Sequence, residues 1–307
     1  MLERLDGRFL VTFLAVWKEG TISGAAAKLG YVQSTVTAHI QLLEQSCGQK
    51  LFHRLPRGVK PTEAGEKLAR YARQFAQLGQ SLQEALNSLE QPRGAVWIRA
   101  LESFYVTRLT GLFRPFLAQY PEVSLHLETG FQGDIVEQVL SHSIDFGIVP
   151  KNPMREELLF EPLIEEKMVL ISSAELARTI AMQGWEQLQG VQVIGFGPRC
   201  LYQTDGYKIL TEMGMPAEIR QAEFPSTELI RQLIKNGMGI AYVPEIALER
   251  ELAEGTVVAL PMTQPLRLTH GLLQHRDRVL NTPAKVFRQE LLDYFNESTS
   301  RLKINRS

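Results

Sequence analysis

The chain has very little cysteine and no long uncharged apolar run. Its 307 residues include only Cys47 and Cys200, which are too far apart to suggest a disulfide framework or a multi-cysteine zinc site. No stretch has eighteen consecutive uncharged apolar residues, and the start of the sequence lacks the apolar run of a signal peptide. We therefore expect a soluble cytoplasmic protein with no metal, no cofactor and no membrane contact.

The sequence also lacks the motifs of common enzyme classes. It has no Walker loop, no Gly-x-Ser-x-Gly elbow and no His-Glu-x-x-His pair. Two Gly-x-Gly fragments, beginning at Gly195 and Gly237, do not complete a dinucleotide fingerprint. The histidines of the C-terminal two thirds show no ligand-like clustering: His126, His142, His270 and His275.

Charge is unevenly distributed along the chain. Residues 1–93 carry 12 Lys and Arg against 8 Asp and Glu, whereas residues 94–307 carry 21 against 26. Hydrophobic residues make up 44% of the chain, which is enough for more than one core at this length. A basic N-terminal part attached to an acidic body indicates that only the N-terminal part meets a polyanion such as nucleic acid.

Residues 1–61 have the pattern of short helices followed by a hairpin. Apolar residues at helical spacing in 8–18 and a short alanine-rich segment precede a helix over 33–44, whose Val36, Ile40 and Leu43 share one face. The other face is polar and short-chained, as a recognition helix requires to enter a major groove. An ordinary solvated surface helix has the same polar face, so the context decides between the two readings.

That context is a basic hairpin. Residues 51–62 predict two short strands around a Pro-Arg-Gly turn, and such a wing suits phosphates or a minor groove. Arg57 lies nearest the tip. The residues expected to contact DNA are Ser23, Gln33, Ser34, Thr35, Thr37, His39, Arg54, Arg57 and Lys60.

A long helix is predicted to follow the hairpin over 62–93. Thr62-Glu-Ala-Gly caps its start, and apolar residues then recur at alternating spacings of three and four, which is a heptad seam. A lone amphipathic helix packed on its own domain has a similar stripe, but about thirty residues exceeds the usual globular helix. We therefore expect dimerisation through Leu68, Tyr71, Phe75, Leu78, Leu82, Ala85 and Leu89.

Four ordered blocks of this region resemble the LysR-type transcriptional regulators. They are SGAAAKL at 23–29, QSTVTAHIQLLE at 33–44, LFHR at 51–54 and TEAG at 62–65. Ala38 departs from the longer polar or basic residue that members often carry there, and Pro61 replaces a common leucine. The resemblance extends over essentially the whole chain, with weaker motifs after residue 94.

The resemblance implies a multidomain protein with a winged helix-turn-helix head, a linker helix and an effector domain like the periplasmic binding proteins. It implies double-stranded DNA with an interrupted inverted repeat in a promoter as a partner. A small-molecule effector, often anionic, and RNA polymerase are further implied partners. A homodimer or a dimer of dimers is the implied assembly.

Residues 94–307 alternate between strand-like and helix-like segments, which predicts two open α/β lobes. We expect lobe I over 94–164 and 266–307, and lobe II over 165–265. Ligands of such sheets bind beyond the carboxyl ends of strands, near helix N-termini. The expected effector-binding residues are Ser103, Phe104, Tyr105, Gly130, Gln132, Val149, Arg199, Cys200, Gln203, Ser226 and Thr227.

Arg199 and Cys200 are the most chemically distinctive members of this set. A guanidinium beside a helix start suits a carboxylate, phosphate or sulfate, although a surface salt bridge is an equally good reading. Cys200 reads more readily as packing than as a redox sensor, because no resolving cysteine is near it in the sequence.

The predicted function is DNA binding gated by a small effector held between two lobes. A bifunctional enzyme with a DNA-binding head is the alternative, and the missing enzyme motifs weigh against it. A plain solute-binding protein is a third possibility, opposed by the basic head and the absent export signal.

Overall fold

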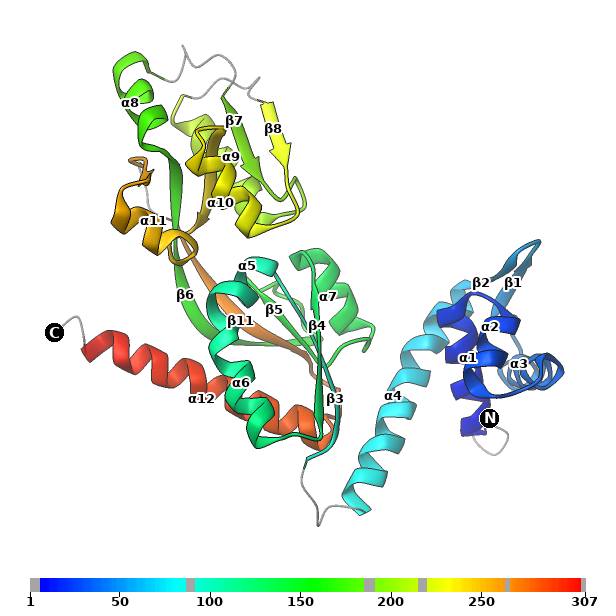
Figure 1. Ribbon diagram of the computed structural model, residues 1–307. Helices are drawn as coiled ribbons and strands as arrows, with labels where there is room; N and C mark the ends of the chain where they lie inside the picture. The colour runs from blue at the N-terminus through cyan, green and yellow to red at the C-terminus, as the bar shows by residue number, and fades with distance from the viewer. Residues whose placement is uncertain (1–5, 87–91, 185–190, 215–219, 263–265, 305–307) are drawn as a thin grey trace.

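The computed structural model describes residues 6–86, 92–184, 191–214, 220–262 and 266–304. In chain order it has a small helical head, a long helix and a two-lobed α/β body (Figure 1). The multidomain architecture expected from the sequence is therefore confirmed. The head and the long helix comprise α1 (Gly7–Glu19), α2 (Ile22–Leu29), α3 (Gln33–Cys47), β1 (Phe52–Leu55), β2 (Gly58–Pro61) and α4 (Glu63–Leu86).

The three helices of the head close around one apolar core. Phe13, Val16, Val36 and Leu43 have no exposed surface. Thr21 caps α2, since its side-chain oxygen accepts a hydrogen bond from the backbone of Gly24 at 3.0 Å. Each of the three helices ends at a glycine in the left-handed conformation, which stops the helix without steric cost: Gly20, Gly30 and Gly48.

The β1–β2 hairpin is fixed against the turn between α1 and α2. The backbone N–H of Val59 donates to the carbonyl of Gly20 at 2.8 Å. Gly58 has a φ of +116°, and a Cβ at this position would lie 2.4 Å from the same carbonyl oxygen. Glycine is therefore required at position 58, and the wing is held in one place relative to the helices.

Helix α4 belongs to the head at its N-terminal end. Thr62 caps it, accepting a hydrogen bond from Gly65 N–H at 3.0 Å and donating to Lys50 C=O at 2.7 Å. Ala69 and Ala72 are fully buried in the core of the head. The helix then runs out of the head toward the body (Figure 1).

The body is built on one long mixed sheet in the order β4-β3-β5-β11-β6-β9-β7-β8, with β10 paired to β6. Parallel pairing joins β3 to β4 and β5 in one half, and β7 to β8 and β9 in the other. The antiparallel strands β6 and β11 cross between the halves (Figure 1). The strands are β3 (Gly94–Ala100), β4 (Val123–Thr129), β5 (Phe146–Val149), β6 (Leu158–Ser173), β7 (Gln192–Gly195), β8 (Arg220–Glu223), β9 (Gly239–Pro244), β10 (Val257–Ala259) and β11 (Arg267–His275).

Helices cover both lobes of this sheet. In lobe I, α12 packs with α6, whereas α7 packs on β5 and β11, and the core includes Phe116, Phe146 and Phe287. The helices are α5 (Glu102–Phe104), η2 (Tyr105–Leu109), α6 (Thr110–Gln119), α7 (Gln132–Leu140), α8 (Ala174–Gln183), α9 (Leu201–Glu212), α10 (Thr227–Lys235), η4 (Glu245–Leu248), α11 (Glu249–Glu254) and α12 (Thr282–Ile304).

Two elements differ from the sequence expectation in extent. The helix-like pattern of residues 106–118 predicts one helix, but this segment is the π-helical turn η2 followed by α6, with the short α5 before them. The strand-like pattern of residues 167–172 predicts a short strand, but this segment is the C-terminal half of β6, which pairs with β9, whereas the N-terminal half of β6 pairs with β11. Strand β6 belongs to both lobes, and its residues change from mixed burial in the first half to nearly continuous burial in the second. A continuous apolar run in the sequence therefore indicates only the second half.

Candidate DNA-binding surface and effector cleft

The start of α2, one side of α3 and the wing surround an open groove on the head, with a volume of about 760 Å³. The wing can face α3 in this way because the hairpin is bonded to the α1–α2 turn. Five of the residues expected to contact DNA line the groove, namely Ser23, Gln33, Thr37, Arg54 and Arg57. Ser34, Thr35 and Lys60 do not line this groove.

Helix α3 is seated by one face and open on the other. Val36, Ile40 and Leu43 are buried, whereas Gln33 and Ser34 are exposed. Gln41, which was not among the residues expected to contact DNA, also lines the groove. The spacing of four from Gln33 to Thr37 to Gln41 was the available signal, because side chains at i, i+4 and i+8 share one stripe of a helix.

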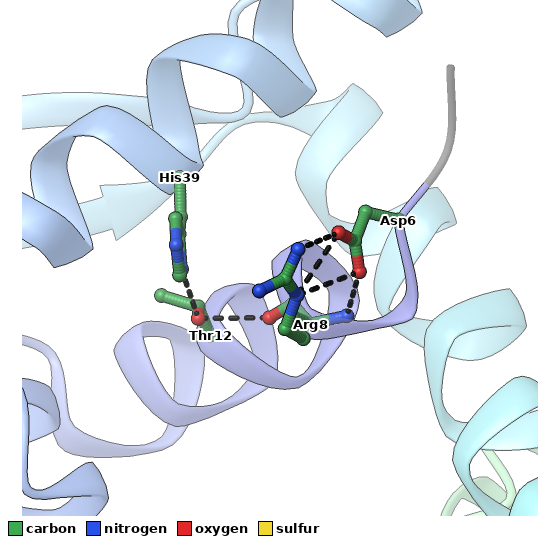
Figure 2. A network of polar contacts seen from close by, with 4 residues as sticks. All are labelled: Asp6, Arg8, Thr12 and His39. Carbon is green, nitrogen blue, oxygen red and sulfur yellow. Dashed lines mark hydrogen bonds and ion pairs between the residues drawn. The ribbon is translucent and has the colours of Figure 1, made fainter.

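His39 does not lie on that stripe. Its Nδ1 is 2.9 Å from the hydroxyl of Thr12 on α1, and that hydroxyl donates to the carbonyl of Arg8 at 2.8 Å (Figure 2). The imidazole also contacts the Phe9 ring, with centroids 5.0 Å apart, and the Tyr31 ring, at 5.6 Å. His39 therefore packs α3 against α1 and does not line the groove, and its contact with DNA stays a prediction.

Figure 2 also shows how the start of α1 is fixed. The Asp6 carboxylate accepts from the backbone N–H of Arg8 at 2.9 Å and from its guanidinium at 2.6 Å. These hydrogen bonds hold the pKa of Asp6 below its usual value. An N-terminal carboxylate cap stabilises the helix that carries Thr12.

Four of the seven expected seam residues are exposed on α4: Tyr71, Phe75, Leu78 and Leu82, with 69%, 47%, 56% and 59% of their surface accessible. Leu68 differs, because it packs against the core of the head. The side chain of Ala85 and all of Leu89 lie outside the described residues.

A second cleft, with a volume of about 480 Å³, separates the two lobes of the body. It lies beyond the carboxyl ends of β3 and β4 in lobe I and of β7 and β8 in lobe II, as expected for an open α/β sheet. Its lining is Arg99, Leu101, Glu102, Ser103, Thr129, Gly130, Phe131, Asp134, Phe196, Arg199, Cys200, Tyr202, Glu223, Phe224 and Pro225.

The cleft brings charges of both signs together. Arg99 donates from Nε to the carbonyl of Thr129 at 2.9 Å, and a Cβ at Gly130 would lie 2.4 Å from that nitrogen. Arg199 reaches from lobe II to lobe I, where its Nη1 lies 3.5 Å from the Asp134 carboxylate and its guanidinium carbon 5.0 Å from the Phe131 ring centroid. Arg199 is therefore a bridge between the lobes.

Glu102 is the second bridge between the lobes. Its Oε2 accepts from the backbone N–H of Thr227 at 3.1 Å and from the Thr227 hydroxyl. Thr227 begins α10, and the N-cap residue Ser226 makes no side-chain cap hydrogen bond. A carboxylate from lobe I thus occupies the anion-binding start of a lobe II helix.

Several expected effector residues lie elsewhere. Phe104, Tyr105 and Val149 are buried in the core of lobe I, at the end of α5, the start of η2 and the end of β5. Gln132 lines a different, more open pocket, which also has residues of both lobes in its lining. Gln203 and Thr227 line a small cavity of about 20 Å³ behind the cleft, together with Ser103 and Cys200. Ser103, Gly130, Arg199 and Cys200 line the cleft as expected.

Four charged residues of the cleft were absent from the sequence expectation: Arg99, Glu102, Asp134 and Glu223. Arg99 and Glu223 belong to strands β3 and β8, whereas ligand-binding residues were expected beyond the strand ends. Asp134 in the first turn of α7 is the one with a sequence signal, since an acidic residue there is typical of a helix start.

Cys200 is a packing residue in this structure. Its side chain is buried in the core beside Tyr202, and burial raises the pKa of its thiol. A raised pKa reduces the thiolate fraction, so the redox-sensing interpretation is disfavoured.

Strands β6 and β11 carry polar contacts where the lobes join. Arg108 of lobe I binds the buried Glu166 through two hydrogen bonds of 2.5 and 2.7 Å. The hydroxyl of Tyr202 in lobe II lies 2.5 Å from Nε2 of His270, whose ring stacks on Phe104. Burial lowers the pKa of His270 to about 3.

In the described parts of the chain, no three His, Cys, Asp or Glu side chains are grouped as a metal site would need. None of the helices in those parts has the length and apolarity to span a bilayer.

Comparison with known proteins identifies both parts of the chain. Residues 8–66 match the family described as "Bacterial regulatory helix-turn-helix protein, lysR family", and residues 89–296 match "LysR substrate binding domain". The regulator YofA of Bacillus subtilis (strain 168) is 34% identical over 78% of this chain and 81% of its own length. The regulator GltR of the same strain is 28% identical over 94% of this chain and 96% of its own.

Solved full-length regulators have the same fold. LysG from Corynebacterium glutamicum, solved with bound effector Arg, gives a TM-score of 0.73 at 21% identity and covers 95% of this chain and 99% of its own. ArgP from Mycobacterium tuberculosis gives 0.74 at 21% identity, covering 96% and 98%. These relatives are transcriptional regulators and not enzymes. The chain belongs to the LysR family of helix-turn-helix transcriptional regulators, with a DNA-binding head and an effector-binding body.

Proposed function

We propose that this regulator binds an interrupted inverted repeat in promoter DNA through α3 and the wing of two heads, and that a small molecule in the interlobe cleft controls this binding. One observation carries the proposal: the exposed polar stripe of α3 and the basic wing line the same groove. Polar side chains on α3 suit base edges in a major groove, whereas Arg54 and Arg57 suit phosphates or the minor groove.

The DNA-binding part is tested by fluorescence anisotropy on a duplex from the region upstream of the protein's own gene. Arg57→Ala removes a phosphate contact, so it weakens binding to all sequences and lowers the salt slope by about 1. Gln41→Ala removes a base contact, so it reduces discrimination between sequences by about 1–3 kcal/mol.

The matched control is Arg250→Ala, which also removes an exposed arginine, on α11 in lobe II. It should leave affinity, discrimination and salt slope at their wild-type values. If Arg57→Ala and Arg250→Ala behave alike, the wing does not contact DNA.

We propose further that the effector is a small zwitterion. The cleft holds the guanidinium groups of Arg99 and Arg199 together with the carboxylates of Glu102, Asp134 and Glu223. A guanidinium binds a carboxylate, and a free carboxylate binds an ammonium group. The Glu102 carboxylate already accepts a hydrogen bond at the start of α10, so a simple anion cannot use that donor as part of its site. The bound Arg in the LysG structure supports a ligand of this class.

A thermal-shift panel distinguishes these ligand classes. Arginine, lysine and other amino acids are compared with sulfate, phosphate and acetate, and a ligand at 100 times its dissociation constant adds about 2.7 kcal/mol of stability. The zwitterion proposal predicts a shift with at least one amino acid that both Arg199→Met and Glu223→Gln reduce. A shift with simple anions that Glu223→Gln leaves unchanged contradicts it.

The exposed apolar face of α4 supports a homodimer, and a dimer of dimers is the assembly we propose on DNA. An effector that prefers one lobe arrangement re-spaces the heads and changes DNA affinity roughly 5–150-fold, for a coupling of about 1–3 kcal/mol. We also propose that the DNA-bound regulator contacts RNA polymerase at the promoter.

A further inference from the structure

Helix α7 contacts other parts of the chain at both of its ends. At its N-terminal end, Asp134 lies in the cleft 3.5 Å from Nη1 of Arg199, which belongs to lobe II. At its C-terminal end, Nη1 of Arg73 on α4 donates to the carbonyl of Ser141 at 3.0 Å. Beside it, Nε2 of Gln74 lies 2.7 Å from Nε2 of His142. Figure 1 shows α7 on the side of lobe I nearest α4.

The contact between Arg73 and Ser141 is a helix C-terminal cap supplied by another part of the chain. Ser141 directly follows α7, where carbonyl groups lack intrahelical donors and the helix dipole favours a cation. The same guanidinium lies over the Trp17 ring of α1, with its carbon 4.3 Å from the ring centroid. One arginine side chain therefore touches the DNA-binding head and the effector domain together.

Helix α7, which connects these two ends, is expected to move as a rigid unit. Ile135, Val136 and Val139 fix α7 in the core of lobe I. Nine helical residues span about 13 Å. The loop after α7 is fixed as well, because Arg278 donates to the carbonyl of His142 at 2.9 Å and forms a buried ion pair with Asp145.

His142 adds a further sign that this loop is constrained. It has a φ of +54°, which non-glycine residues seldom adopt, and its side chain is buried against the His275 ring at a centroid distance of 4.1 Å. Such a conformation persists only where surrounding contacts determine it. Those contacts include Gln74 of α4, so the loop conformation depends on where α4 lies.

We propose that α7 and Arg73 transmit the state of the cleft to the DNA-binding head. A change in the contact at Asp134 is transmitted along α7 to Ser141. There it changes the hydrogen bond from Arg73 to the Ser141 carbonyl and the contact of Arg73 with the Trp17 ring. This inference rests on the proposed function, because it presumes that the head binds DNA and that the cleft controls it. It assigns Arg73 as a positioning residue that couples two domains.

The test is a double-mutant cycle on DNA affinity, which needs no effector. Asp134→Asn removes the charge that Arg199 faces, and Arg73→Met keeps the aliphatic stem but removes the guanidinium. Each variant and the double variant are titrated by anisotropy against the upstream duplex. We expect Asp134→Asn to change the dissociation constant roughly fivefold or more when Arg73 is present, and by much less in the Arg73→Met background.

The matched control is Arg70→Met, which removes an exposed arginine one turn earlier on the same helix. In the Arg70→Met background the effect of Asp134→Asn should be undiminished. Equal effects of Asp134→Asn in all three backgrounds overturn the proposal. If the wild-type chain binds no upstream DNA, the proposed function fails instead, so the two failures are distinguishable.

Hydrogen exchange of the full chain supplies a second readout that does not depend on affinity. Arg73→Met should raise exchange at the C-terminal end of α7 and in residues 141–145, and Asp134→Asn should change exchange in α1 only while Arg73 is present. Unchanged exchange in residues 141–145 after Arg73→Met overturns the proposal, provided that the melting curve shows a folded variant.

Discussion

At the scale of single residues, His270 is buried and neutral where the two lobes join. Its pKa is lowered to about 3, first by burial and then by the nearby Arg108 guanidinium. The unfolded chain has an ordinary histidine pKa near 6.5, so between these values the unfolded state binds the proton and the folded state does not. Folding stability that is fully present above pH 6.5 is therefore lost as the pH falls toward 3.

This predicts a steep acid dependence of stability that His270→Gln reduces. In urea unfolding between pH 5.5 and 4, the slope of the unfolding free energy against pH should fall by roughly 1.4 kcal/mol per pH unit in the variant. His53→Gln, a change at an exposed wing histidine, is the control and should leave the slope unaltered. An unchanged slope in His270→Gln would show that the imidazole is protonated in the folded protein.

Residues also show where sequence reasoning reaches its limit at the candidate sites. Gln33, Thr37 and Arg57 were predictable, because their sites are local in the chain. Glu102 was not, because its partner Thr227 is 125 residues away and only the arrangement of the two lobes brings them together. The contact of His39 with Thr12 was not predictable for the same reason, because it depends on how α3 packs on α1.

At the scale of elements, the sequence predicted the helices of the head, the hairpin and most strands of the body. The order of strands in a sheet is not local, so the crossing of β6 and β11 between the lobes could not be read from periodicity. Apolar spacing did predict the stripe on α4. It did not reveal that Leu68 packs into the head while Tyr71 and Phe75 stay exposed, since that depends on where the head ends.

The stripe on α4 leads to an element-scale prediction. Leu78 and Leu82 are more than half exposed in the single chain, which is costly for large apolar side chains unless a partner covers them. Leu78→Glu with Leu82→Glu places four like charges in the seam of a dimer, so sedimentation should show monomers at concentrations where the wild type is dimeric. Lys67→Glu on an exposed position of the same helix is the control. A wild-type protein that is monomeric at these concentrations would contradict dimerisation through the α4 seam.

At the scale of the whole molecule, one chain of contacts links three units. The cleft lies between lobes that are joined by β6 and β11, α7 runs from the cleft to α4, and α4 is built into the head through Ala69 and Ala72. In the proposed dimer, contact through α4 would fix the separation of two α3 helices, so we expect the protein to read two half-sites in a set geometry.

The most direct test of this account is a hydroxyl-radical footprint of the full chain on its upstream DNA. The account predicts two protected half-sites related by inverted symmetry, with centres one helical turn of about 10–10.5 base pairs apart, or a multiple of that. The seam variant with Glu at positions 78 and 82 should lose the joint protection at the same protein concentration. A single asymmetric protected site for the wild type, unaffected by the seam variant, would contradict the account.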